Sequence, residues 1–327
     1  MDTTPVSASG LAKYYRIDGN KLQKQYKHHL SGFEDWDQLL HAEDWILFGQ
    51  NLGSHVCIDE VALSQGELYT VITNGSAGCQ QGSLIAMVKD TKSEEVIRIL
   101  QKIPLKARKQ VKEVTVDLAA NMNKIGRTAF PQARLIMDRF HVQQLPSEAL
   151  QQMRIKHRWE AIDKETEQIK LAKEQHKKYQ PEVFENGDTP KQLLARSRYL
   201  LFKPKSKWTE KQLLRATILF EKYPDLEKGY ELSMMLRGVY QNNTNIQMAK
   251  EHLERWYKKI DKYHFDAFVT AANSIKAHQE EILNYFFNRR TNSLAENFNG
   301  KIKAFRATFR GIRDLPFFLY RVSLIFS

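Results

Sequence analysis

The sequence predicts an α/β protein in which a mixed five-stranded sheet is interrupted by a large all-helical insertion. Two observations support this fold class. Apolar, β-branched segments of strand length gather between residues 54 and 142, whereas residues 144–288 are highly charged and have the periodicity of helices. The apolar and aromatic residues 315–327 then close the chain, and we expect them to pack back on the sheet.

Five segments have the composition of β-strands. They are His55–Leu63, Glu67–Thr73, Leu84–Lys89, Val111–Asp117 and Ala133–Asp138. Short turns join the first three, which predicts an antiparallel meander. A helical segment precedes each of the last two, and helical crossovers place strands parallel.

The N-terminal residues predict two short helices. Ala8 to Arg16 and the basic segment Lys21 to Leu30 flank a turn signal, Asp18-Gly19-Asn20. Helix, tight turn and basic helix form the pattern of a helix-turn-helix, which reads DNA with its second helix. The alternative is a helical hairpin that packs on the following domain, because a stable helix-turn-helix module needs a third helix.

The composition favours a folded protein with a polyanionic partner. Lys plus Arg number 50 against 38 for Asp plus Glu, a net charge of +12, which favours nucleic-acid binding through counterion release. A generally basic surface is the plain alternative. The two cysteines, Cys57 and Cys79, are too few for a Cys₄ zinc ribbon and indicate a reducing compartment. Without an apolar run of ~18 residues or a signal peptide, a cytoplasmic protein with no membrane segment is expected.

Three widely spaced carboxylates give the clearest functional signal. Asp59 and Asp117 end two predicted strands, and Glu296 lies in the first turn of a basic helix, Ser293–Ala307. Carboxylate oxygens are the ligands that Mg²⁺ prefers, and such a group can hold two ions on either side of a phosphodiester. Each carboxylate also has a structural explanation: a strand-end acid, a helix cap, and a capping box of Ser293 with Glu296.

The segments around these carboxylates resemble DDE transposases of bacterial insertion sequences, most of all the IS-L-three family. The matching segments are Ile58-Asp59-Glu60, Val116-Asp117, Asp138-Arg139-Phe140-His141 and Thr291 to Lys303. The resemblance implies an RNase H-like fold whose helical insertion lies between the fifth strand and the helix that carries Glu296. It also implies metal-dependent cleavage of transposon-end DNA and strand transfer into target DNA.

The resemblance implies a role for each carboxylate. Asp59 would bridge two Mg²⁺ ions, for which Mn²⁺ would substitute, while Asp117 would bind one ion and Glu296 the other. Asp138 also ends a strand and is the alternative second ligand, but the strand of Asp117 is expected to neighbour the strand of Asp59. Four polar residues are expected to support the ligands or to contact DNA: Asp138, His141, Asn292 and Asn299.

Basic residues on and after the last long helix predict a track for DNA phosphates. Its members are Lys301, Lys303, Arg306, Arg310 and Arg313. A second candidate for contact with transposon-end DNA lies in the insertion and includes Arg154 and Arg158.

These predictions divide the chain into four segments. Residues 1–50 form a short helical N-terminal segment, 51–145 the first part of the catalytic core, 146–288 the insertion, and 289–327 the second part of the core with the Glu296 helix. Relatives usually carry a cysteine-rich zinc module and a helix-turn-helix ahead of the core, and this chain departs from that pattern.

The departure bears on the expected partners. A separate polypeptide is expected to supply the missing DNA-binding region. The other partners would be double-stranded DNA, as transposon terminal repeats and as target, and a second copy of the chain on that DNA. Two other functions stay open: a non-catalytic or domesticated DNA-binding protein, and an RNase H-type nuclease without strand transfer.

Overall fold

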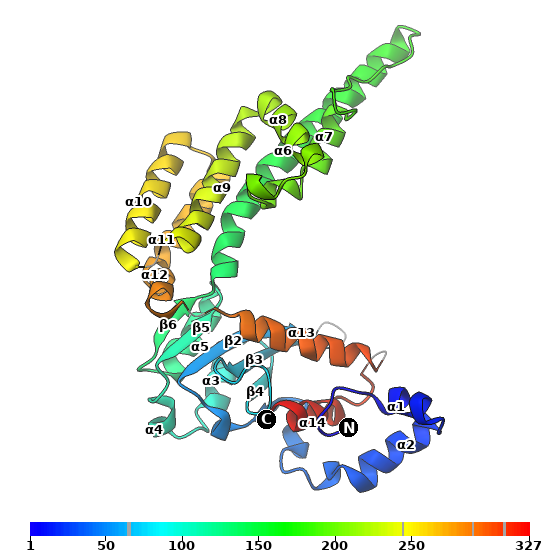
Figure 1. Cartoon of the computed structure of the whole chain (residues 1–327), viewed down its shortest axis with the longest axis vertical. Helices are drawn as coiled ribbons and strands as arrows, with labels where there is room; N and C mark the ends of the chain where they lie inside the picture. Colours follow the sequence, from blue (N-terminus) through cyan, green and yellow to red (C-terminus); the bar gives the residue numbers. More distant parts are fainter. Residues whose placement is uncertain (64–66, 244, 290, 310–311) are drawn as a thin grey trace. The chain divides into compact units, whose positions relative to one another are not determined.

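The protein folds as two compact units. The computed structural model describes residues 1–63, 67–243, 245–289, 291–309 and 312–327. The first unit comprises Met1–Asp138 and Asn288–Ser327, and the second comprises Arg139–Phe287. The first unit contains a mixed sheet and the second is built from helices (Figure 1). In sequence, the second unit therefore lies between the two parts of the first.

The sheet of the first unit has six strands in the order β1-β4-β3-β2-β5-β6. They are β1 (Trp45–Leu47), β2 (His55–Ala62), β3 (Leu68–Asn74), β4 (Leu84–Lys89), β5 (Glu113–Val116) and β6 (Arg134–Met137). The antiparallel meander of β2, β3 and β4 is confirmed, and β5 and β6 continue the sheet in parallel with β2. The sequence predicted five strands, and the sheet has six. Strand β1 pairs with β4 at the edge, and its three residues are too few to show an alternation.

One face of the sheet packs on the C-terminal helices. These are α13 (Ser293–Ala307) and α14 (Leu315–Phe326), and they share a buried cluster with residues of β2, β3 and β4. Val71, Met87 and Phe298 are at most 1% exposed in this cluster. Burial of apolar side chains at about 25 cal/mol per Å² is the main force that holds α13 on the sheet.

The other face packs on helices from the middle of the first unit. Helix α5 (Ala120–Ala129) lies against β5 and β6, and α3 (Ser93–Leu100) packs beside it, while the short α4 (Leu105–Arg108) precedes β5. The approach of α5 is close, because a Cβ atom on Gly126 would lie 2.6 Å from Leu135. The two faces of the sheet are thus covered by different parts of the chain.

The N-terminal residues form a helical hairpin that packs on the last helix. Helix α1 (Ala8–Tyr15) is followed by α2 (Gly19–Gln25), which Asp18 caps by accepting two backbone N–H groups. A π-helical turn after α2 places Tyr26 in a buried aromatic cluster with α14. The cluster consists of Tyr26, Phe33, Phe317 and Tyr320. This is the packing that the hairpin alternative predicts.

A fully buried arginine fixes the first residues of the chain to α14. Arg321 is 0% exposed, and its Nη2 donates to the carbonyl oxygens of Thr4 and Val6 at 3.3 and 3.4 Å. Its guanidinium also lies 5.2 Å from the centre of the Tyr26 ring, a cation–π contact. Burial lowers the pKa of this guanidinium. The residues that precede α1 are therefore held against α14 by a charged group inside the core.

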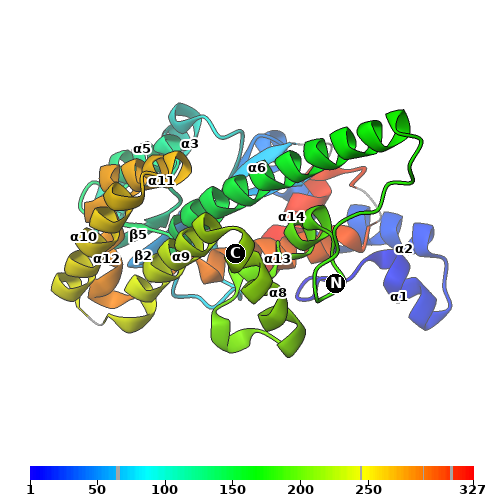
Figure 2. The ribbon, with the colours of Figure 1, turned by 90° about the horizontal axis from the view of Figure 1, so that it is seen from above.

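The second unit is built on one long helix. Helix α6 (Arg139–Glu174) packs on α7, α9 and α11 (Figures 1 and 2). The other helices are α7 (Pro190–Arg196), α8 (Glu210–Lys222), α9 (Pro224–Asn242), α10 (Ile246–Tyr263), α11 (Asp266–Ala277) and α12 (Gln279–Asn288). In the part of the chain that the structure describes, no helix combines the length and the apolar character needed to cross a membrane.

A buried carboxylate joins α7 and α8. Asp188 is 0% exposed and pairs with Arg196 and with Arg215, whose Nε lies 2.8 Å from Asp188 Oδ2. Burial by itself raises the pKa of Asp188, but the two guanidinium groups outweigh it and the pKa is lowered. The carboxylate therefore stays ionised inside the second unit.

Candidate active site

Each of three neighbouring parallel strands leads to an aspartate: Asp59 lies within β2, and Asp117 and Asp138 directly follow β5 and β6. Cys57 of β2 is level with Thr115 of β5, which in turn is level with Ile136 of β6. The residues two positions further along are Asp59, Asp117 and Asp138. Because side chains alternate along a strand and strands lie about 4.8 Å apart, these aspartates share one face and one level of the sheet. It is the face that α13 covers.

Asp59 is held by a side chain from α13. Its Oδ1 accepts a hydrogen bond from the backbone N–H of Glu60 at 2.8 Å, and its Oδ2 accepts one from the Nδ2 amide of Asn299 at 2.9 Å. Asn299 is 5% exposed and also donates to the carbonyl of Glu60 at 3.3 Å. This contact orients the Asp59 carboxylate and joins the middle of α13 to the second half of β2.

Asp117 and Asp138 differ in their surroundings. Asp117 is half-buried, and its Oδ1 accepts the backbone N–H of Ala119 at 2.8 Å, which shapes the turn into α5. Asp138 is 2% exposed, and its Oδ1 lies 3.4 Å from the backbone N of Asn292, just ahead of α13. Asp117 is thus the more accessible of the two candidates for the second ligand.

Helix α13 brings Glu296 between these contacts. Asn292 contacts Asp138 just after β6, and Asn299 contacts Asp59 within β2. Glu296 follows Asn292 by four residues and precedes Asn299 by three, so it lies on the same side of the helix as both. Its side chain is exposed, and within the described residues it makes no hydrogen bond or ion pair.

The capping box of Ser293 and Glu296 is not formed. Asn292 is the N-cap and makes no side-chain capping bond, and Ser293 is already the first residue of α13. The N–H of Ser293 instead faces the hydroxyl of Thr291 at 3.4 Å. The structural explanation for Glu296 is therefore wrong, and its carboxylate has no capping role.

The turn between β3 and β4 supports α13. The thiol of Cys79 donates to the carbonyl of Leu294 at 2.9 Å, and Nζ of Lys301 donates to the carbonyl of Cys79 at 2.8 Å. Cys79 adopts a left-handed φ of 58°, an uncommon conformation for a residue other than glycine. Cys79 thus contacts α13 at two points: Leu294 in the first turn and Lys301 about two turns further along.

The charges at the strand ends act on two neighbouring groups. Burial, with smaller effects from Asp138 and Asp59, raises the pKa of the Cys57 thiol to about 12. Burial likewise raises the pKa of Glu60, with further contributions from Asp117 and Asp59. Strand alternation places Glu60 on the opposite face from Asp59, yet the charges of Asp117 and Asp59 still act on its carboxyl group.

The predicted basic track on α13 is exposed only in part. Lys303 and Arg313 are exposed, whereas Arg306 donates to backbone carbonyls at the end of β2 and Lys301 uses its ammonium on the β3–β4 turn. Arg310 lies outside the described residues. Lys303 and Arg313 are therefore the members of the track best placed to bind phosphates.

The candidate residues of the second unit also differ from one another. Arg154 is 6% exposed and donates to Gln151 Oε1 at 2.7 Å and to the carbonyl of Leu194 at 2.9 Å. It joins α6 to α7, and the interpretation of Arg154 as a DNA contact is corrected accordingly. Arg158 is exposed, and His141 is half-buried in the first turn of α6.

The donor atoms of the three candidate ligands suit a divalent cation. Asp59, Asp117 and Glu296 offer carboxylate oxygens, the preferred ligands of Mg²⁺. Over the described ranges, however, no three His, Cys, Asp or Glu side chains lie close enough together to hold an ion. The chemistry of these residues thus suits the cation, but the structure does not gather them into a metal site.

The family of the chain follows from comparison with known proteins. A family model described as a transposase, that of the IS-L-three DDE transposases, matches residues 56–322. No curated protein and no solved structure gives a match. The matched range takes in the sheet from β2 onward, the whole second unit, and α13 with Glu296. Because it covers more than half of the 327 residues, the chain belongs to the IS-L-three family of transposases.

Proposed function

We propose that this transposase cuts transposon-end DNA and joins it to target DNA by metal-dependent DDE chemistry. Asp59, Asp117 and Glu296 are the proposed ligands of two Mg²⁺ ions. The observation that supports this best is the course of α13, which meets Asp138 at Asn292 and Asp59 at Asn299. Glu296 lies between these contacts, above the strand that ends at Asp117.

We infer that the first unit is an RNase H-like catalytic core. Its meander β2-β3-β4 followed by the parallel strands β5 and β6 is the arrangement that the family resemblance implies. On this reading, the second unit is the helical insertion predicted at residues 146–288. The edge strand β1 and the N-terminal hairpin are additions to that core.

The residues of the chain would prepare the reaction in three ways. Asn299 would fix the orientation of the Asp59 carboxylate toward an ion, and Glu296 would contribute a third carboxylate from α13. Lys303 and Arg313 would bind phosphates beside the scissile bond. When bound, the ions would activate a water or a DNA 3′-hydroxyl and stabilise the leaving oxygen of an in-line displacement.

We propose double-stranded DNA as the substrate, with two chains bringing together the two transposon ends. Specific recognition of the ends would come from a separate polypeptide. A non-catalytic DNA-binding protein is the second candidate function. It is favoured by one observation: the described carboxylates are not gathered into a metal-holding group.

Nicking and joining of labelled transposon-end DNA in Mg²⁺ or Mn²⁺ tests the proposal. We expect the wild type to do both, Asp117→Asn to be inactive, and Asp138→Asn to keep measurable activity. The reverse order of the two variants would make Asp138 the second ligand. Cleavage without joining would indicate a nuclease, and an inactive wild type, even with the partner polypeptide, would indicate a binding protein.

Replacing Asn299 should weaken the site without unfolding it. We expect Asn299→Ala to lower the cleavage rate by about 10–100-fold, the usual cost of losing a residue that orients a metal ligand, and to raise the Mg²⁺ concentration needed for half-maximal rate. Asn297→Ala is the matched control, since Asn297 is exposed on the same helix. An unchanged Mg²⁺ requirement in Asn299→Ala would show that Asn299 only supports packing.

A further inference from the structure

A groove in the second unit combines apolar and basic side chains. It lies along α9 and α10, which pack side by side, and has a volume of about 680 Å³. Met234 and Met235 of α9 line it and are half-buried. No sequence motif marks this groove, because its residues come from three separate segments of the chain.

The groove has more cations than its carboxylate can neutralise. The cations that line it are Lys205, Arg237, Arg255 and Lys259. Glu231 is the acidic residue of the lining, and it pairs with Lys259 at 2.8 Å. The other three cations form no ion pair with a carboxylate of the described residues. An anion bound here would therefore meet charge that the protein itself does not offset.

Arg237 has an unsatisfied donor. Its Nη1 donates to the carbonyl of Phe202 at 3.2 Å, which fixes the direction of the guanidinium. Its Nε is buried and has no hydrogen-bond acceptor within the described part of the chain. A buried N–H without an acceptor is unfavourable, and an anionic oxygen would supply one.

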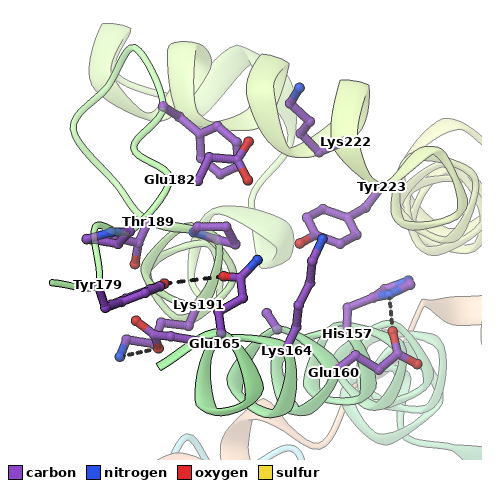
Figure 3. A pocket seen from close by; sticks show the side chains of 15 residues that line it. His157, Glu160, Lys164, Glu165, Tyr179, Glu182, Thr189, Lys191, Lys222 and Tyr223 are labelled. Atoms are coloured by element: carbon purple, nitrogen blue, oxygen red, sulfur yellow. Dashed lines mark hydrogen bonds and ion pairs between the residues drawn. The ribbon is translucent and has the colours of Figure 1, made fainter. Parts of the chain in front are cut away.

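A second cavity in the same unit has balanced charges, unlike the groove along α9 and α10. It has a volume of about 270 Å³ and lies between α6 and the segment that leads into α7 (Figure 3). Its lysines are matched by as many glutamates: Lys164, Lys191 and Lys222 against Glu160, Glu165 and Glu182. Lys191 pairs with Glu165 at 2.5 Å. The charges of these lysines and glutamates balance, so the cavity has no net positive charge to attract a polyanion.

We propose that the groove along α9 and α10 binds the sugar–phosphate backbone of DNA. The guanidinium groups of Arg237 and Arg255 and the ammonium of Lys205 contact phosphate oxygens, and Met234 with Met235 contacts deoxyribose. A planar guanidinium matches two phosphate oxygens at once, which favours a phosphodiester over a lone carboxylate. The proposal requires that the transposase binds DNA, but it does not require the metal chemistry of the first unit.

Salt-dependent binding of a short labelled duplex by the full chain, in EDTA, tests the groove. We expect Lys205→Gln combined with Arg255→Gln to lower the slope of log affinity against log salt by about 2, one for each phosphate that the variant can no longer neutralise. Lys211→Gln combined with Lys250→Gln is the matched control. Both lysines are exposed in the same unit, and neither lines the groove. The control should keep the wild-type slope.

An equal decrease of the slope in both double variants would overturn the proposal, because it would show an effect of overall charge. An unchanged slope in the groove variant would also overturn it. Arg237→Lys, which keeps the charge but removes Nε–H, should weaken binding with little change in slope. Because the assay runs in EDTA and measures binding alone, a failure of the catalytic proposal would leave this test intact. Circular dichroism checks that each variant is folded.

Discussion

Asp59→Asn is expected to abolish both cleavage and joining. Asp59 lies within β2, in the interior of the sheet, and Nδ2 of Asn299 donates to one of its oxygens at 2.9 Å. The substitution keeps the shape of the side chain and removes the charge that would bind the ions. Metal ions contribute several kcal/mol to the stabilisation of such transition states, so we expect the rate to fall by roughly 10³-fold or more.

The measurement is a single-turnover assay on pre-nicked and intact transposon-end DNA, which reports joining and cleavage separately. Asp37→Asn is the control, because Asp37 is an exposed carboxylate in the same unit. Thermal unfolding and DNA binding should match the wild type in both variants. A folded Asp59→Asn protein with wild-type activity would exclude Asp59 as a metal ligand.

Asp188→Asn is expected to destabilise the second unit by about 3 kcal/mol. That is the lower end of the cost of breaking a buried ion pair, and we choose it because the Arg196 side chain is 55% exposed and water can solvate it. Urea denaturation gives the change in unfolding free energy, and hydrogen exchange of amides in α7 and α8 shows where it arises. Asp163→Asn is the control, since Asp163 is exposed on α6.

The effect of Asp188 should depend on pH in a fixed direction. Its pKa is lowered in the folded protein, so its contribution is complete above the ordinary aspartate value of 3.8 and is lost as the pH falls through the lower folded value. The stability difference between wild type and variant should therefore be constant near neutral pH and shrink in strong acid. A difference that grows on acidification would contradict the ion-pair explanation.

The periodic parts of the fold could be predicted from the sequence. Five strands, the crossover helices and the helix of Glu296 have clear alternation or helical period, and the structure contains them all. β1 was missed because three residues carry no period. The packing role of Arg154 was also missed, because a charge pattern along α6 does not reveal which side of the helix α7 will cover.

Contacts between distant residues account for what the sequence could not reveal. Asn299 donates a hydrogen bond to Asp59, which lies 240 positions away in the sequence. Lys205 lines the same groove as residues of α9 and α10, but only once the second unit has folded. Such pairings depend on the register of strands and on helix packing, which single-sequence patterns do not encode. The segment Asp138-Arg139-Phe140-His141 pointed to Asp138, yet the contact of Asp138 with Asn292 is visible only in the structure.

The division of the first unit into two stretches of chain sets an order of events during synthesis. Strands β1 to β6 leave the ribosome early, but one face of their sheet stays uncovered until α13 and α14 are made, while residues 139–287 form a continuous unit that can fold in the meantime. Contacts of such long sequence separation form late. Under the proposed function, Glu296 would therefore join the other proposed ligands last, so a nascent or truncated chain would lack one of the three carboxylates.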